Sequence, residues 1–122
     1  MFRIVFHVAD SGRCPVRDFL DALPDIRAKA RLLRAIQRLG EEGFLPEPFS
    51  KAISGSRKLR ELRVGFDGNI YRVFYSLVSG RRIVLLHGFV KKTSKTPSGE
   101  ILIADKRLRQ FLEKDHEDPT KR

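Results

Sequence analysis

Three alternating apolar segments between residues 60 and 91 constrain the fold most. Residues 62–66 alternate apolar with polar or small side chains, the period of a β-strand with one buried face. Asp67-Gly68 follows, a pair that favours a tight hairpin because both residues tolerate positive φ. Residues 69–78 form the next segment and end at the turn signal Ser79-Gly80. Residues 81–90 then give an unbroken apolar run, typical of a central strand, so an antiparallel meander is predicted.

The N-terminal third predicts one more strand and a pair of helices. Residues 2–8 alternate like a strand, and Pro15 suits the first position of a helix because its missing N–H costs nothing there. A second helix is expected from Asp25 to Leu39, with Gly40 as its C-cap. The residues expected on its inward face are Ile26, Ala30, Leu33 and Ile36, with arginines outward.

The remaining segments predict a loop and a last helix. Residues 41–58 contain two prolines and are interpreted as a loop. Ser98 is a candidate N-cap of the last helix. Its expected apolar stripe consists of Ile101, Ala104, Leu108 and Leu112. We therefore predict an α+β fold, with a small antiparallel, mixed-edge sheet against an N-terminal helix pair and a C-terminal helix. One domain is expected over residues 1–112, followed by a polar, frayed tail over residues 113–122.

Composition narrows the class of protein. The 122 residues suit one small domain, and no apolar run is long enough to cross a bilayer. Asp10 interrupts the N-terminal apolar stretch, which argues against a signal peptide. Cys14 is the single cysteine, and the three histidines are scattered, so no disulfide, metal site or cofactor is expected. A cytoplasmic protein that does not bind membranes is expected.

The net charge of +10 is concentrated in one segment. Residues 57–95 hold ten basic and two acidic residues, so this segment accounts for +8 of the total. A positive field gathered on one part of a small domain favours a polyanionic partner such as a nucleic acid.

Within this segment, Arg63 and Arg72 interrupt apolar strand patterns, and three lysines follow the third strand in KKTSK, residues 91–95. Arg72 is expected on the exposed face of its hairpin. It could lie flat over the sheet, or hold a rigid guanidinium group for a phosphate. The lysines could form a solvated loop or join the two arginines in one positive surface. His87 fits a structural histidine better than a base. Tyr75 fits core packing, although a position near the sheet end would also allow it to stack on a base.

The motifs occur in a recognisable order: PVRDFL, LRELR, YRVFY, VLLHGFVKKTSKTP and EI. From about Phe2 to Leu112, this order resembles the RelE/HigB superfamily of toxins from toxin–antitoxin systems, and most of all its phage-derived HigB-like branch. The resemblance implies a RelE-like fold and an endoribonuclease that cuts mRNA on the ribosome without a metal ion. It also implies a cognate antitoxin partner, often with a helix-turn-helix DNA-binding domain.

The resemblance also implies site residues. Arg63, Arg72 and Lys92 correspond to basic positions of the family, or Lys91 if the alignment shifts by one residue. RelE has a further basic residue where this chain has Glu61, and a tyrosine near residues 97–98, so the proton-transfer groups do not carry over. A lysine crowded by other cations has a lowered pKa and could act as a base. The residues expected to bind RNA outside the catalytic set are Lys58, Arg60, Tyr75 and Lys95.

Two other functions fit the same charge pattern. One is a noncatalytic nucleic-acid-binding module, and the other is an inactive toxin that only binds its antitoxin. Cut RNA would distinguish the enzyme from both alternatives.

Overall fold

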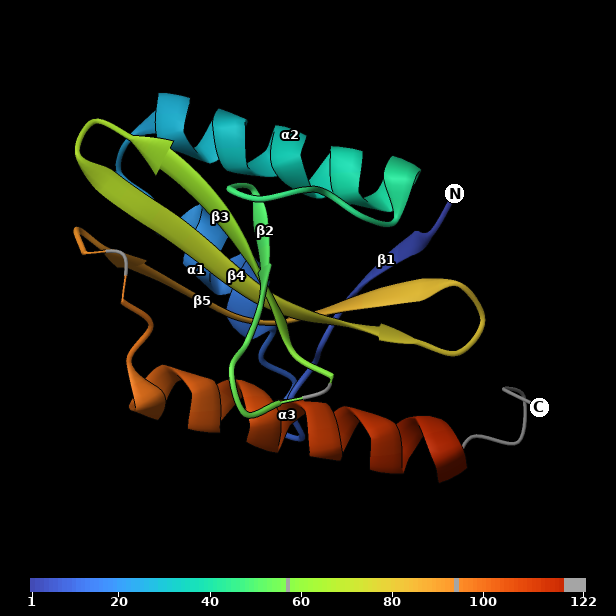
Figure 1. Cartoon of the computed structure of the whole chain (residues 1–122). Helices are drawn as coiled ribbons and strands as arrows, with labels where there is room; N and C mark the ends of the chain where they lie inside the picture. Colours follow the sequence, from blue (N-terminus) through green and yellow to red (C-terminus); the bar gives the residue numbers. More distant parts are fainter. Residues whose placement is uncertain (57, 94, 118–122) are drawn as a thin grey trace.

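The computed structural model describes residues 1–56, 58–93 and 95–117 (Figure 1). Within these residues, one strand and two helices are followed by four strands and a last helix. In chain order they are β1 (Arg3–Phe6), α1 (Pro15–Asp21), α2 (Ile26–Glu42), β2 (Ser50–Ala52), β3 (Arg60–Phe66), β4 (Asn69–Val78), β5 (Arg82–Lys91) and α3 (Ser98–Glu117).

One five-stranded sheet has the order β1-β5-β4-β3-β2. Strands β3, β4 and β5 form the predicted antiparallel meander, while β1 pairs with β5 in parallel and gives the sheet its mixed edge. Asp67 and Gly68 have φ of 50° and 80°, as the predicted hairpin requires. A register shift after Phe74 places Leu86 and His87 on the same face of β5.

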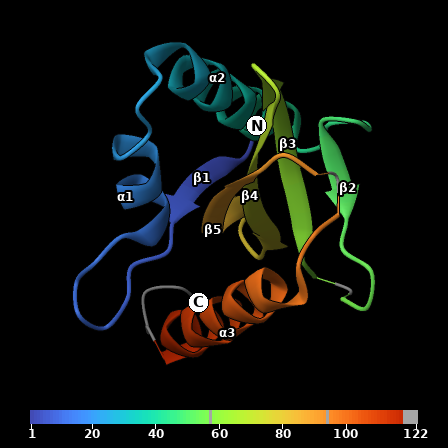
Figure 2. The same cartoon turned by 90° about the vertical axis from the view of Figure 1, so that its left-hand side faces the viewer.

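Helices cover both faces of this sheet (Figure 2). One apolar core lies between the sheet and the helices α1 and α2, and a second lies between the sheet and α3. The predicted α+β class, helix pair and C-terminal helix are confirmed. The predicted apolar stripe of α3 is also confirmed, since Ala104 and Leu108 are buried and Ile101 and Leu112 pack beside them.

The predicted inward face of α2 was wrong. Ile26 is 80% exposed and Leu33 is 43% exposed, whereas Leu32 is fully buried. The buried residues of α2 are Ala28, Leu32, Ile36, Leu39 and Gly40. This stripe also has helical spacing and shares Ile36 with the predicted one, so periodicity alone could not separate the two.

Four other predicted features also change. The C-cap of α2 is Gly43, with φ of 75°, and Gly40 lies inside the helix. The expected loop contains the edge strand β2, and Ser98 is the first helical residue of α3. The polar tail is not frayed through residue 117, because α3 continues there and Asp115 accepts two hydrogen bonds from Arg82, at 2.8 and 2.7 Å. Residues 118–122 of that tail lie outside the described residues.

Candidate functional site

The sheet register brings several predicted site residues onto the face covered by α3. Arg63 of β3 lies directly opposite Arg72 of β4, and Arg72 lies opposite Phe89 of β5. Lys91 is two residues beyond Phe89 and pairs with Ile70, so alternation places it on this face, one row along. Arg63, Arg72 and Lys91 therefore gather at one end of the sheet.

Arg72 is completely buried, so its predicted position on an exposed face was wrong. The prediction treated the meander as an open sheet, but α3 and the residues leading into it cover this face. The side chain lies over the ring of Phe89, with its guanidinium carbon 5.5 Å from the ring centre. Burial lowers the pKa of Arg72, and the nearby Glu61 carboxylate opposes that effect.

The guanidinium group of Arg72 is engaged by the chain between β5 and α3. It donates to the carbonyl oxygens of Thr93 and Lys95, the latter at 2.9 Å, and to Oγ1 of Thr96 at 3.3 Å. These contacts fix the backbone that holds Lys95. Arg72 therefore holds the segment between β5 and α3 in place, like a clamp, and its guanidinium N–H groups donate to oxygen atoms of the protein.

Glu61 is the counter-charge of this clamp. It is fully buried, and its Oε1 lies 3.4 Å from Nε of Arg72 and 3.7 Å from Nε of Arg63. Its Oε2 accepts a hydrogen bond of 2.8 Å from Oγ1 of Thr96. A buried charge is costly unless it is paired and hydrogen-bonded, so each of the two buried charges, on Glu61 and on Arg72, depends on the other for compensation.

The open part of the site consists of cations around this buried pair. The Arg63 side chain is 16% exposed, while Lys91, Lys92 and Lys95 are exposed. Lys91 and Lys95 line a surface hollow of about 550 Å³ at the start of α3, together with Thr93, Thr96, Pro97, Ser98 and Ile101. The geometry therefore places Lys91 beside the Arg72 row, whereas Lys92 follows the last residue of β5. Such a rim can hold a phosphate electrostatically.

Two predicted RNA-binding residues lie on the other face of the sheet. Tyr75 is 1% exposed, so its ring cannot stack on a base in this structure. Its hydroxyl lies 2.5 Å from Oγ of Ser50 and accepts a hydrogen bond from Nε of Arg60 at 3.3 Å. Arg60 alternates with Glu61 and thus faces away from Arg72. Lys58 is exposed just before β3.

His87 has partners on both ring nitrogens. A guanidinium nitrogen of Arg107 lies 3.0 Å from Nδ1, and Oε2 of Glu100 lies 2.6 Å from Nε2. Because Arg107 can only donate, Nδ1 accepts and Nε2 holds the proton that is shared with Glu100. The ring also stacks on Phe89, with centroids 5.8 Å apart. This geometry agrees with the predicted structural histidine.

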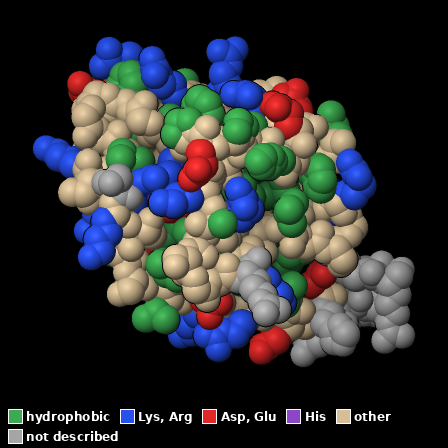
Figure 3. Space-filling view, in the orientation of Figure 1, with side chains coloured by type: hydrophobic (Ala, Val, Ile, Leu, Met, Phe, Trp, Pro, Cys, Tyr) green, Lys and Arg blue, Asp and Glu red, His purple; other side chains and the backbone are tan. Residues whose placement is uncertain are grey.

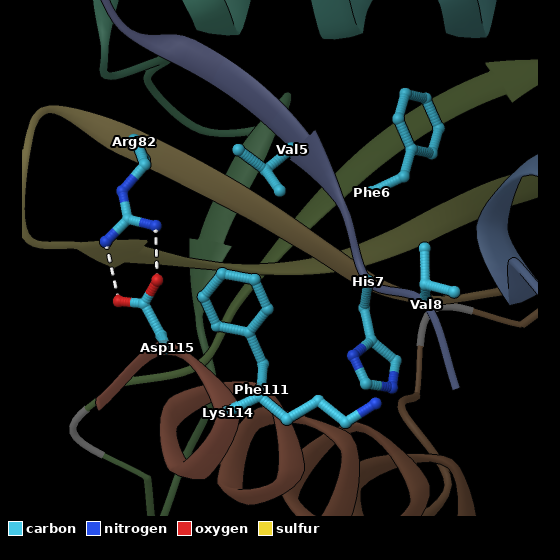
Figure 4. A pocket seen from close by; sticks show the side chains of 8 residues that line it. All are labelled: Val5, Phe6, His7, Val8, Arg82, Phe111, Lys114 and Asp115. Carbon is cyan, nitrogen blue, oxygen red and sulfur yellow. Dashed lines mark hydrogen bonds and ion pairs between the residues drawn. The ribbon is translucent and has the colours of Figure 1, made fainter. Parts of the chain in front are cut away.

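A second hollow, of about 270 Å³, lies at the opposite edge of the sheet, between β1 and α3 (Figure 4). His7 projects into it beside Lys114, and the ion pair of Arg82 and Asp115 stands at its other end. Nε2 of His7 is buried without a hydrogen-bond partner in the part of the chain that the structure describes. Burial lowers the pKa of His7, and the positive charges of Arg107 and Lys114 lower it further.

Sequence reasoning missed the role of Glu61 and Thr96. Glu61 was noted as a departure from RelE, although a lone acid two residues before Arg63 shares its strand face and is a natural partner for a neighbouring arginine. Nothing in the local pattern of Thr96 indicates its contact with Glu61, because the two residues are far apart in the sequence.

Comparisons with known proteins point to one family. No curated protein matches the chain. Within the described residues, none of the helices combines the length and the apolar character that crossing a bilayer requires. Residues 18–109, well over half of the chain, match the family model "Phage derived protein Gp49-like (DUF891)", a toxin-like family of toxin–antitoxin systems, and the chain therefore belongs to this Gp49-like family.

Proposed function

We propose that this protein is the toxin of a toxin–antitoxin pair and that it inhibits translation by cutting mRNA on the ribosome. Membership of the Gp49-like family and the resemblance to RelE and HigB support the toxin role. The observation that supports RNA as the target is the cluster of Arg63, Lys91 and Lys95 at one end of the sheet. Its partner in the cell is a cognate antitoxin, and co-purification with the product of the adjacent gene tests that pairing.

The proposed reaction needs no metal ion. The ribose 2′-oxygen attacks the adjacent phosphorus, the bond from phosphorus to the 5′-oxygen breaks, and the electron pair leaves with that oxygen. The products are a 2′,3′-cyclic phosphate and a 5′-hydroxyl. Arg63 offsets the negative charge that develops on the phosphorane, because a preorganised guanidinium group stabilises charge without reorganising. Lys91 or Lys92, as the neutral amine, takes the proton from the 2′-hydroxyl, and a solvent water gives a proton to the leaving 5′-oxygen.

Arg72 has a positioning role in this proposal. Its donors are already bonded to the chain between β5 and α3, so it holds Lys95 and its neighbours in place. The side chain of Arg63 is 16% exposed whereas that of Arg72 is fully buried, so Arg63 is the better candidate for direct contact with the scissile phosphate.

Primer extension on mRNA after induced expression tests the proposal. We expect new 3′ ends with wild-type protein, and roughly 10²–10³-fold fewer with Arg63→Ala, the scale of losing one preorganised donor. Lys106→Ala removes an exposed positive charge from α3 and is the control. Equal cutting by Arg63→Ala and wild type at equal expression would remove Arg63 from the site.

A noncatalytic RNA-binding toxin is the second candidate. The engagement of Arg72 by protein oxygens favours it, because this arginine then has no free fork for a phosphate. Growth arrest with intact mRNA would support this candidate and count against cleavage.

A further inference from the structure

Four arginines form a straight line along the outer surface of α2. Arg27, Arg31, Arg34 and Arg38 are spaced by four, three and four residues, which places them on one side of a helix. All four are exposed, and the stripe is about 16 Å long at the rise of an α-helix. We call this set the α2 arginine stripe. It lies outside the residues 57–95 that concentrate the charge in the sequence.

Phenylalanine rings lie next to these arginines. The guanidinium carbons of Arg27 and Arg31 are 5.2 and 4.9 Å from the ring centre of Phe66, and that of Arg38 is 5.8 Å from Phe49.

One further ring extends the series: Arg60 lies 5.7 Å from the ring of Phe44. Phe44 is 56% exposed and Phe49 is 44% exposed, which is unusual for large aromatic side chains. Figure 3 shows Lys and Arg side chains over α2, with hydrophobic side chains and a few acidic ones between α2 and the middle of this face.

The positive charges in the middle of the stripe are not balanced by acidic side chains in the described part of the chain. Arg38 pairs with Glu42 at 3.2 Å, and Arg27 pairs with Asp25 at 3.3 Å. Arg31 and Arg34 have no ion-pair partner within residues 1–56, 58–93 and 95–117. Both central guanidinium groups are therefore available to an anionic partner.

The stripe and the candidate site meet at the β3 edge of the sheet. β2 pairs with Arg60, Glu61 and Leu62, and the N–H of Arg63 donates to the carbonyl oxygen of Phe49 at 2.8 Å, so β3 becomes an edge from Arg63 onward in the described part of the chain. On that stretch, Arg63 faces the α3 side, while Phe66 faces α2 and the stripe. A strand of RNA that leaves Arg63 can thus cross this edge and reach α2.

We propose that the α2 arginine stripe, with Phe44 and Phe49, binds the single-stranded mRNA that extends from the candidate site. Its phosphates contact Arg31 and Arg34, and unstacked bases lie on the two exposed rings. A row of cations with exposed aromatic rings near one end suits single-stranded nucleic acid, because stacking supplies affinity without requiring one base sequence. This inference rests on the proposed function for the identity of the RNA.

Fluorescence anisotropy with a labelled, unstructured RNA of about 12 nucleotides tests the proposal. The test variant is Arg31→Gln with Arg34→Gln. The control is Lys106→Gln with Arg109→Gln, which removes the same charge from the exposed side of α3. We expect the test pair to reduce the salt slope by about 1.4, or about 0.7 for each lost phosphate contact, and the control to leave it unchanged.

A separate variant tests the role of the exposed aromatic rings in RNA binding. Phe44→Leu keeps an apolar side chain but removes the ring, and we expect roughly tenfold weaker binding, within the range for losing one base stack. Leu102→Ala, which shortens another exposed apolar side chain, should bind RNA like wild type.

Three outcomes would overturn the proposal: equal losses in the test and control pairs, no loss in either pair, or loss of antitoxin binding with RNA binding intact. The last would identify a protein interface. Because the readout is binding, wild-type protein that binds RNA through α2 without cutting it would reject the proposed cleavage and keep this inference.

Discussion

The two faces of the sheet are built from different chemistry. The face under α1 and α2 is packed with aliphatic and aromatic side chains, among them Leu32, Val73 and Leu85. The face under α3 also has an apolar core, but it buries Glu61 and Arg72 at its margin. Where α2 packs, the first face needs only volume and shape to be filled, and elsewhere on it the buried hydroxyls of Ser50 and Tyr75 are hydrogen-bonded to each other. The second also needs charges to be matched.

This difference shows where a small toxin-like fold holds its polar chemistry. The apolar residues between the sheet and the helix pair could be replaced by other apolar residues of similar size. The α3 face instead links stability to the position of a surface segment, because Arg72 forms an ion pair with Glu61 and donates a hydrogen bond to the backbone of Lys95. The predictions below test this contrast.

Arg72→Ala should cause the largest loss. It removes the nearer of the two arginines that pair with the buried Glu61, and breaking a buried ion pair costs about 3–5 kcal/mol of unfolding free energy. This replaces the sequence-based expectation that folding would suffer little. Urea unfolding followed by circular dichroism measures the loss, and a loss below about 0.5 kcal/mol, typical of surface sites, would contradict the burial of the pair.

A double variant sharpens this result. Glu61→Leu with Arg72→Met leaves no lone charge, so it should be more stable than Arg72→Ala alone. If both are equally unstable, the important contacts of Arg72 are those with the backbone carbonyls of Thr93 and Lys95.

The α2 face should respond to volume alone. Leu32→Ala should cost about 3 kcal/mol, because it opens a cavity in a fully buried position. Leu33→Ala, at the half-exposed neighbour, should stay within about 0.5 kcal/mol. The same unfolding measurement applies. Equal losses at both positions would contradict the finding that Leu32, and not Leu33, faces the core.

The smallest effect should appear as a pH dependence on the α3 side. The pKa of His7 is lowered below its ordinary value of 6.5, so the folded state keeps the ring neutral. Its contribution to stability is present above 6.5 and is lost as pH falls from that value towards the folded pKa. Melting temperatures measured from about pH 7.5 to about pH 5.5 should fall for wild type and fall less for His7→Gln. Parallel curves for the two proteins would exclude this role of His7.

The local pattern was enough to predict most of the fold. Alternation and the Asp67-Gly68 turn predicted the meander, and Pro15 begins α1 as expected. The inward face of α2 was missed because two stripes with helical spacing share Ile36. The choice between them depends on how α2 packs against the sheet, which no local pattern encodes.

The candidate site was predictable only in part. The sequence suggested that Arg63 and Arg72 join the lysines in one positive surface, and the strand register does place the two arginines opposite each other, but the pattern could not tell an open face from one covered by α3. Tyr75 and Arg60 were predicted to bind RNA, although alternation along β3 places the side chain of Arg60 on the other face of the sheet from that of Arg63. The catalytic and binding roles of these residues remain predictions.

The parallel pairing of β1 with β5 has a consequence for the order of synthesis. Ile4 is synthesised well before its partner Ile83, and long-range pairing of this kind is slow to form. Thr93, Lys95 and α3 come later still. We therefore expect a nascent chain that stops before these residues to lack the contacts that hold Arg72, and so to lack the proposed toxin activity.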